Sequence, residues 1–231
     1  MTRTVRLVAL TAGLSTPSST RMLTDQLTRE SAAALSREGS QVEATTVELR
    51  EYAHDVTDAL LTRFPSEKLA MVIEQVRAAD AVIAVTPVFN VGPSGLFKMF
   101  FDAVDMEIWK DKPVLIGATA GTARHSLAID YAVRPMFGYL KSEVVPTAVF
   151  AASADFGADT EGQADGQPLA VRVRRAAGEL AIMLRADLGE TVPQSEADSA
   201  SATDGADEST APALDAEFSD FVPMGKLLGR G

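Results

Sequence analysis

Short apolar runs alternate with stretches of helical periodicity along the first 190 residues or so, and this alternation most limits the folds open to the chain. Four runs are nearly continuous in apolar residues, at 5–10, 81–85, 113–118 and 144–151, and a fifth, 41–49, alternates apolar with polar residues. Continuous runs of this length predict strands that are buried on both faces, whereas the alternating run predicts an edge or half-covered strand. We therefore expect five strands with helices between them.

The segments between these runs carry apolar residues at helical spacing. One face of each helix is marked by Leu23, Leu27 and Leu35, by Leu69, Val72 and Val76, and late in the chain by Leu169, Val173 and Leu180. Strands that alternate with helices predict an α/β fold, a three-layer sandwich with a parallel sheet in the middle. We expect the flavodoxin-like strand order 2-1-3-4-5, in which ligands bind beyond the carboxyl ends of the strands.

Composition excludes several classes of function. The chain has no cysteine and two histidines, so disulfides and thiolate metal centres are excluded and no metal site is expected. No apolar run approaches the roughly 20 residues that a membrane span needs. The N-terminus has a weak similarity to a secretory signal, because a basic start is followed by a short apolar run. A first buried strand is the favoured interpretation of this run, and we expect a cytoplasmic location.

The net charge of −11 is concentrated near the C-terminus. Nine acidic residues and no Lys or Arg lie between 190 and 220, which leaves the rest nearly neutral and makes nucleic acid an unexpected partner. We expect a folded domain over 1–189 and an acidic disordered linker over 190–213. The apolar residues of 214–231 predict either a segment that folds back on its own or a neighbouring subunit, or a docking motif for a partner enzyme.

The first apolar run ends in a turn that is rich in hydroxyl groups. Ser15, Ser18, Ser19 and Thr20 lie just where a helix presents unpaired N–H groups, a common place for a phosphate. A solvated helix N-cap explains the same residues. Because no GxGxxG and no GxxxxGK[ST] follows this run, a dinucleotide fingerprint and a Walker site are missing, and a monophosphate such as that of flavin mononucleotide (FMN) fits better.

Two further loops follow the third and fourth strands. The first of them, Thr86 to Gly95, is stiffened by prolines and runs into a helix that is rich in phenylalanine, and the second follows Ala118 with small residues. Taken one at a time, these are ordinary turns. All three unusual loops nevertheless fall at carboxyl ends of predicted strands, where one binding site can draw on all of them.

Two phrases carry a resemblance to a known family. The chain reads TPVFNVGPSGLFKMFFD at 86–102 and GATAGTARHSLAIDYAVRP at 117–135. In this order, after the hydroxyl-rich loop, they resemble the NAD(P)H-dependent FMN reductases of flavodoxin-like fold. The similarity is strongest to the flavin reductases of two-component luciferase-like and alkanesulfonate monooxygenase systems.

The resemblance implies a set of binding residues. The residues that hold the flavin phosphate are Ser15, Ser18, Ser19 and Thr20, with Arg21 as charge partner. The isoalloxazine ring system is flanked on one side by Pro87, Val88, Phe89 and Asn90. Its other edge contacts Thr119, Ala120, Gly121 and Thr122. Phe89 stands where the family often has Tyr, which keeps the ring surface and removes a hydroxyl. Arg124 and His125 are candidates for holding the nicotinamide nucleotide, although an exposed pair at a helix start is the simpler reading. The resemblance also places Phe97, Phe101 and Tyr131 at a subunit interface, with a π-bulge at Tyr131.

The expected activity is an NAD(P)H:FMN oxidoreductase that transfers hydride from NADPH or NADH to FMN and supplies a partner monooxygenase. We expect no catalytic acid or base, because hydride passes between stacked cofactors. A homodimer or homotetramer is expected. Two other functions stay open, a quinone or azo-compound reductase with bound FMN and a flavodoxin-type electron carrier.

Overall fold

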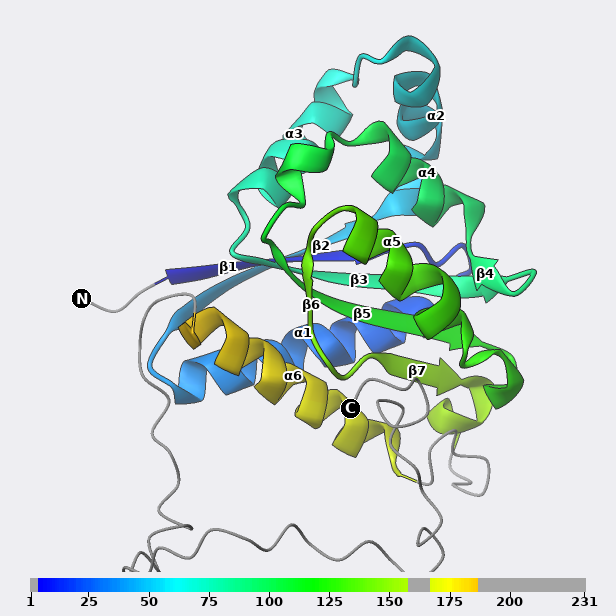
Figure 1. Cartoon of the computed structure of the whole chain (residues 1–231). Helices are drawn as coiled ribbons and strands as arrows, with labels where there is room; N and C mark the ends of the chain where they lie inside the picture. The colour runs from blue at the N-terminus through cyan, green and yellow to red at the C-terminus, as the bar shows by residue number, and fades with distance from the viewer. Residues whose placement is uncertain (1–3, 158–166, 187–231) are drawn as a thin grey trace, which may run out of the picture. The chain divides into compact units, whose positions relative to one another are not determined.

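The computed structural model describes residues 4–157 and 167–186, which form a three-layer α/β sandwich (Figure 1). The parallel strands are β1 (Thr4–Thr11), β2 (Gln41–Glu48), β3 (Ala81–Phe89), β5 (Pro113–Ala120), β6 (Glu143–Val144) and β7 (Val149–Ala152). Their order is β2-β1-β3-β5, with β6 and β7 both paired to β5. Because β6 and β7 together occupy the fifth position, the predicted order 2-1-3-4-5 is confirmed.

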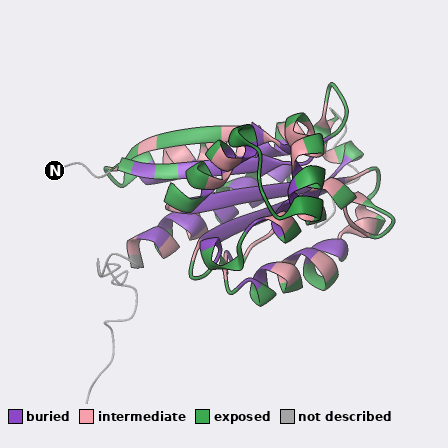
Figure 2. Cartoon of the chain, turned by 90° about the horizontal axis from the view of Figure 1, so that it is seen from above, coloured by how far each residue is buried: buried purple, intermediate pink, exposed green. Residues whose placement is uncertain are grey.

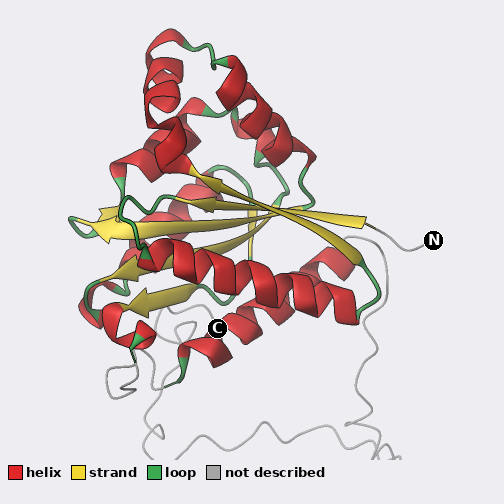
Figure 3. Ribbon diagram, turned by 180° about the vertical axis from the view of Figure 1, so that it is seen from behind, coloured by secondary structure: helices red, strands yellow, loops and turns green. Residues whose placement is uncertain are grey.

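Helices cover both faces of the sheet. Helices α1 (Ser19–Arg37) and α6 (Leu169–Ala186) lie side by side on one face (Figure 3). The other face carries η1 (Leu49–Tyr52), α2 (Ala53–Thr62), α3 (Glu67–Ala78), α4 (Gly95–Ala103), η2 (Met106–Ile108) and α5 (Arg134–Tyr139), as Figure 1 shows. Two apolar cores result, one on each side of the sheet.

The strands are buried as their sequences predict. The central strands β3 and β5 are buried along almost their whole length, which is visible as the purple strands of Figure 2. Strand β2 is mostly exposed or half-buried, as expected for an edge strand with alternating polar residues. Along β1, Val8 and Leu10 pack in the core under α3 and α4, whereas Leu7 and Ala9 pack toward α1.

Strand β3 is longer than the apolar run predicts. It continues through Thr86 and Pro87, which pair with β5, and turns at Asn90 and Val91 into the two-residue antiparallel strand β4 (Gly92–Pro93). Asn90 and Val91 have φ angles of 50° and 68°. Positive φ at both turn positions is the geometry of a tight hairpin, and a β-branched residue such as Val91 adopts it at a cost.

The predicted fifth strand, 144–151, is interrupted. Val145 still donates its N–H to the Val114 carbonyl of β5 at 2.9 Å, but the strand is interrupted at Pro146, which has no N–H to donate, and pairing with β5 resumes at Val149. Glu179 of α6 stabilises the interruption, since its carboxylate accepts hydrogen bonds of 2.7 Å from both the backbone N–H and the hydroxyl of Thr147. Burial alone raises the pKa of Glu179, but the bonds from Thr147 and the nearby Arg175 outweigh burial and lower it.

An aromatic cluster fills the core between α4 and α5. It comprises Phe97, Phe100, Phe101, Trp109 and Phe137, with ring centroids from 4.6 to 6.4 Å apart. Phe97 is fully buried and Phe101 is 3% exposed. The rings of these two phenylalanines, expected at a subunit interface, are covered by their own chain, and their place at an interface stays a prediction.

Some expectations fall outside this part of the chain. The described residues belong to one compact unit, Met1–Val192, and the expected linker at 190–213 and segment at 214–231 lie outside the described residues. Within residues 4–157 and 167–186, no helix is long and apolar enough to cross a membrane. The same residues contain no cluster of three or more metal-binding side chains.

The contact between Glu179 and Thr147 predicts an acid-sensitive contribution to stability. A carboxyl group with a lowered pKa stabilises the folded state above its unfolded pKa of about 4.3, and the contribution disappears as the pH falls through the lower folded pKa. Glu179→Gln should lower the free energy of unfolding by roughly 1 kcal/mol at pH 7, with a difference that shrinks below about pH 4. Urea unfolding across this range measures it.

The matched control is Glu74→Gln, which removes a carboxylate that pairs with Arg77 on the surface. An exposed pair contributes little, so this variant should change stability by less than about 0.5 kcal/mol at either pH. Equal losses in the two variants would show that Glu179 acts only as a surface charge.

Candidate functional site

The three unusual loops meet at one edge of the sheet. In the parallel register Thr11 of β1 pairs with Val85 of β3, and Val85 pairs with Gly117 of β5. The carboxyl ends of these three strands are therefore neighbours, and the loops that follow them start side by side. Ala12 confirms the close approach, since its N–H donates to the Val85 carbonyl at 3.0 Å.

The first loop, residues 12–18, leads tightly into α1. Ser18 caps the helix and accepts a hydrogen bond of 3.2 Å from the N–H of Arg21. A Cβ at Gly13 would lie 2.1 Å from the Ser18 hydroxyl, so a larger residue at this position would displace that hydroxyl from its capping position. The cap uses one of the N–H groups at the start of the helix and leaves those of Ser19 and Thr20 without an intrahelical acceptor. An anion is stabilised at such a position by these groups and by the helix dipole.

A buried hydrogen bond joins the first and third loops. The hydroxyls of Thr20, at the start of α1, and Thr119, near the end of β5, are 2.8 Å apart, and each side chain is 2% exposed. Thr20 was predicted to offer its hydroxyl to the phosphate, and Thr119 to contact the edge of the flavin rings. In the structure the two hydroxyls bind each other and fix the two loops in one relative position.

The second loop is held to the sheet from within. The hydroxyl of Thr86 donates to the Pro87 carbonyl at 2.9 Å and accepts from the Ser94 N–H at 3.0 Å. Ser94 in turn caps α4 by accepting from Phe97 N–H. The segment predicted as a stiff loop is thus a strand and a hairpin, with Pro87 buried, and the start of α4 is fixed against the end of β3.

The predicted residues that offer free surface lie on the hairpin and the turn after β5. Phe89 is 46% exposed, and Asn90, Gly121 and Thr122 are exposed. A Cβ at Gly121 would meet open space. A large apolar ring that is half exposed beside small residues is a surface on which a flat ring system can pack.

The third loop continues into two short helical turns. Thr122 caps η3 (Ala123–His125), with its hydroxyl accepting from the Arg124 N–H at 3.0 Å. The next turn, η4 (Ile129–Val133), is a π-helix, so the π-bulge expected at Tyr131 is confirmed. The side chain of Tyr131 is 79% exposed and free to contact another molecule.

Arg21, the predicted charge partner of a phosphate, pairs with two carboxylates of its own chain. Its guanidinium donates to Asp25 at 2.8 Å and to Glu48 at 2.5 Å, so two carboxylates already balance its charge. The hydrogen bond to Asp25 is the largest of the effects that raise the pKa of Arg21.

The cation that reaches the first loop is Arg50, which sequence reasoning missed. Its guanidinium donates to the Thr16 hydroxyl at 2.6 Å and to the Ser15 carbonyl at 3.3 Å. No local sequence signal pointed to Arg50, because the contact depends on the pairing of β2 with β1.

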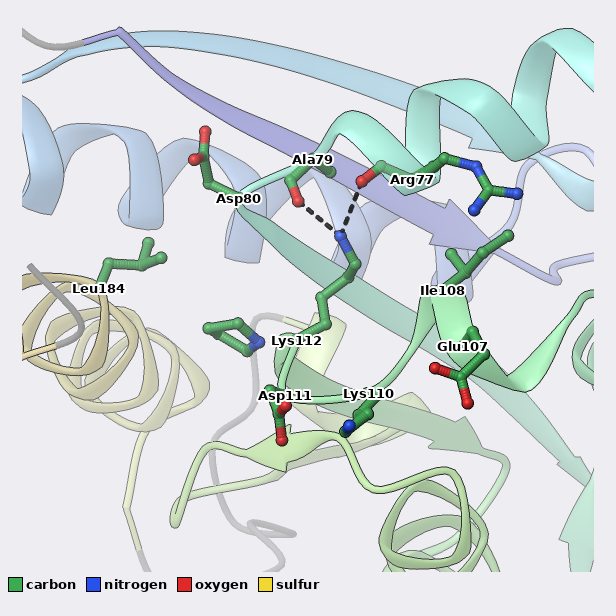
Figure 4. A pocket seen from close by; sticks show the side chains of 10 residues that line it. Arg77, Ala79, Asp80, Glu107, Ile108, Lys110, Asp111, Lys112 and Leu184 are labelled. Atoms are coloured by element: carbon green, nitrogen blue, oxygen red, sulfur yellow. Dashed lines mark hydrogen bonds between the residues drawn. The ribbon is translucent and has the colours of Figure 1, made fainter.

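A hollow of about 360 Å³ lies at the opposite edge of the sheet (Figure 4). Lys112, just before β5, extends its ammonium group to the carbonyls of Arg77 and Ala79 at 3.2 and 2.6 Å, which terminates α3. Burial lowers the pKa of Lys112. This hollow adjoins the amino ends of strands, whereas parallel α/β sheets bind ligands at the carboxyl ends, so we assign Lys112 a structural role.

These features define a class of protein. A flavodoxin-like sheet with an anion-binding helix start and an exposed aromatic hairpin at adjacent strand ends fits a mononucleotide that carries a flat ring. Residues 5–157 match the family model described as NADPH-dependent FMN reductase, and the chain belongs to this family.

Two curated relatives and one solved structure are similar to this chain over most of its length. The chain is 33% identical over 177 residues to the NADH-dependent FMN reductase SfnF of Pseudomonas fluorescens, with 77% of this chain and 90% of that protein covered. It is 32% identical to an FMN reductase (NADPH) of Pseudomonas aeruginosa over 77% of this chain and 91% of that one. An oxidoreductase structure from Corynebacterium diphtheriae shares 43% identity and a TM-score of 0.73, covering 79% of this chain and 98% of that chain.

The hydrogen bond between Thr20 and Thr119 yields a prediction about stability. Thr20→Val should lower the free energy of unfolding by about 1 to 3 kcal/mol, because it leaves the Thr119 hydroxyl buried without a partner. The double variant with Thr119→Val should recover part of this loss, since both hydroxyls are then replaced by methyl groups. Urea unfolding of the two single variants and the double variant measures the coupling.

Thr57→Val is the control, because Thr57 bonds only to a backbone carbonyl on the exposed side of α2. It should change stability by less than about 0.5 kcal/mol. Strictly additive losses in the double variant at positions 20 and 119 would contradict the predicted pairing.

Proposed function

We propose that this NAD(P)H:FMN oxidoreductase supplies reduced FMN to a partner flavin-dependent monooxygenase. One observation supports the proposal that this chain binds FMN. A hydroxyl-rich helix start, an aromatic hairpin and a turn of small residues adjoin at the ends of β1, β3 and β5. Every characterised relative compared above is named as an FMN reductase. The residues fit FMN, since they offer one anion position and one exposed apolar surface.

The chain's residues position the reactants. When bound, FMN accepts a hydride from the nicotinamide. Ser15, Ser18 and Ser19, with the N–H groups at the start of α1, hold the phosphate, and Thr20 supports them through Thr119. Phe89 of the hairpin covers the ring system, with Val88 and Asn90 beside it. The turn formed by Ala120, Gly121 and Thr122 leaves room for the other edge of the rings.

Catalysis then rests on orientation and on exclusion of water. A stacked arrangement of two rings removes the entropy cost of bringing them together, and no proton transfer by a side chain is needed for hydride transfer itself. Arg124 and His125 in η3 are our candidates for holding the nicotinamide nucleotide. The relatives are named for NADH and for NADPH, and we expect the enzyme to use either nucleotide.

Assembly with other chains is also proposed. The exposed Tyr131 on a π-helical turn is a candidate contact between copies of this chain in a homodimer or homotetramer. The monooxygenase is proposed to contact residues 214–231, whose sequence is rich in apolar residues.

The activity is tested by absorbance at 340 nm with NADPH and then NADH, with and without free FMN. We expect nucleotide oxidation that requires FMN and saturates with it, as for an enzyme that releases reduced flavin. Tightly held FMN without direct nucleotide oxidation would favour the electron carrier. Faster turnover with a quinone or an azo dye than with FMN would favour a reductase of those compounds.

The docking proposal is tested by removing residues 215–231. The shortened enzyme should lose the coupled activity of the partner monooxygenase. It should keep its rate of NADPH oxidation with FMN and its elution volume in size-exclusion chromatography, because the proposed FMN site lies elsewhere. Loss of the oligomer or of thermal stability would instead show that the segment folds back onto its own or a neighbouring subunit.

A further inference from the structure

Arg50 reaches the first loop because of the pairing between β2 and β1. In that parallel register Thr11 lies opposite Glu48. The chain after Thr11 forms the first loop, and the chain after Glu48 forms η1, so residues 15 and 16 come beside residue 50. The guanidinium of Arg50 closes the gap with bonds to the Ser15 carbonyl and the Thr16 hydroxyl.

The position of Arg50 is fixed by its own surroundings. Leu49, the preceding residue, is completely buried in the core, and Lys68 of α3 donates to the Glu51 carbonyl at 2.7 Å, which anchors η1 on both sides. The carboxylate of Glu48 forms an ion pair with the Arg50 guanidinium, with 2.7 Å between Oε2 and Nη2. A side chain restrained in this way loses little conformational entropy when it binds a ligand.

The charges around the first loop single out Arg50. The sequence has no Lys or Arg from Thr11 to Thr20, so the loop itself supplies no cation for a phosphate. Arg21 pairs with two carboxylates, those of Asp25 and Glu48. Within the described part of the chain Arg50 pairs with one carboxylate, that of Glu48, and donates two of its five N–H groups to the first loop.

We infer that Arg50 is a phosphate-binding residue of the FMN site, which donates to the flavin phosphate across the loop formed by Ser15 and Thr16. The inference rests on the proposed FMN site and adds a residue from a separate strand to it. Arginine suits the position, because its planar donors bind phosphate in a fixed geometry and stay charged at all working pH values. Arg50 thereby gives the loop the positive charge that its own sequence lacks.

The test compares FMN with riboflavin, which has the same rings and no phosphate. Binding to the full-length apoprotein is measured by quenching of flavin fluorescence at low and high salt. Arg50→Gln should weaken FMN binding about 10- to 100-fold, the loss expected for a hydrogen bond to a charged group, and leave riboflavin binding within about twofold. It should also reduce the salt dependence of FMN binding. Arg50→Lys, which keeps the charge but not the planar donors, should bind FMN with an affinity between those of the parent and Arg50→Gln.

Two controls separate contact with the phosphate from indirect effects. Arg77→Gln removes a charge at the opposite edge of the sheet and should leave both flavins unaffected. The double variant Arg50→Gln/Glu48→Gln restores the charge balance around the loop. FMN binding should stay weak in the double variant, and recovery to the parent affinity would overturn the inference by showing that Arg50 only screens Glu48.

Other outcomes decide against the inference in distinct ways. An unchanged FMN affinity in Arg50→Gln overturns it, and so does an equal loss for FMN and riboflavin, which would mean that Arg50 only supports the loop. A higher KM for NADPH, with NADH and FMN unaffected, would assign Arg50 to the nucleotide's 2′-phosphate instead. If the parent protein binds neither flavin, the proposed function itself is refuted. Because this result comes from the parent protein alone, it is distinguished from a failure of the inference about Arg50.

Discussion

The parallel register of β1, β3 and β5 is the constraint on which the rest of the structure depends. Backbone hydrogen bonds align Thr11, Val85 and Gly117, which are 74 and 32 residues apart in the sequence, so the loops that follow them begin next to one another. Each loop is then fixed by polar contacts that only this register allows. The hydroxyls of Thr20 and Thr119 join the outer two loops, and Thr86 and Ser94 fix the middle one. The site is therefore a consequence of the sheet.

The fold was predictable because its signals are local and strong. Continuous apolar runs can be accommodated only in strands covered on both faces, and leucines at helical spacing need the covering helices. The sequence therefore predicted the layers, the strand order and the exposed edge strand. Two details escaped it. Pairing with β5 extends β3 through Pro87, and the fifth strand breaks near Pro146, where Glu179 compensates for the lost pairing.

The side-chain contacts of the site were not predictable, since sequence patterns do not show which side chains already have partners. In the sequence Phe97 and Phe101 resemble an apolar helix face that contacts another subunit, yet both side chains are buried in the aromatic cluster of their own chain. Arg21 stands next to the predicted phosphate loop, yet Asp25 and Glu48 neutralise it. Arg50 lies 34 residues from Thr16, and no spacing rule connects them. Such contacts follow from strand register, which a single sequence does not reveal at the level of side chains.

The charge balance at the first loop bears on how strongly a phosphate is held. Asp25, Arg21, Glu48 and Arg50 form a continuous chain of ion pairs with two positive and two negative groups. A phosphate that binds Arg50 must share it with Glu48, because the guanidinium is already paired. Preformed geometry then gives selectivity for the phosphate, while the shared charge limits the gain in affinity. A site of this kind suits an enzyme whose proposed role is to bind FMN, reduce it and release it.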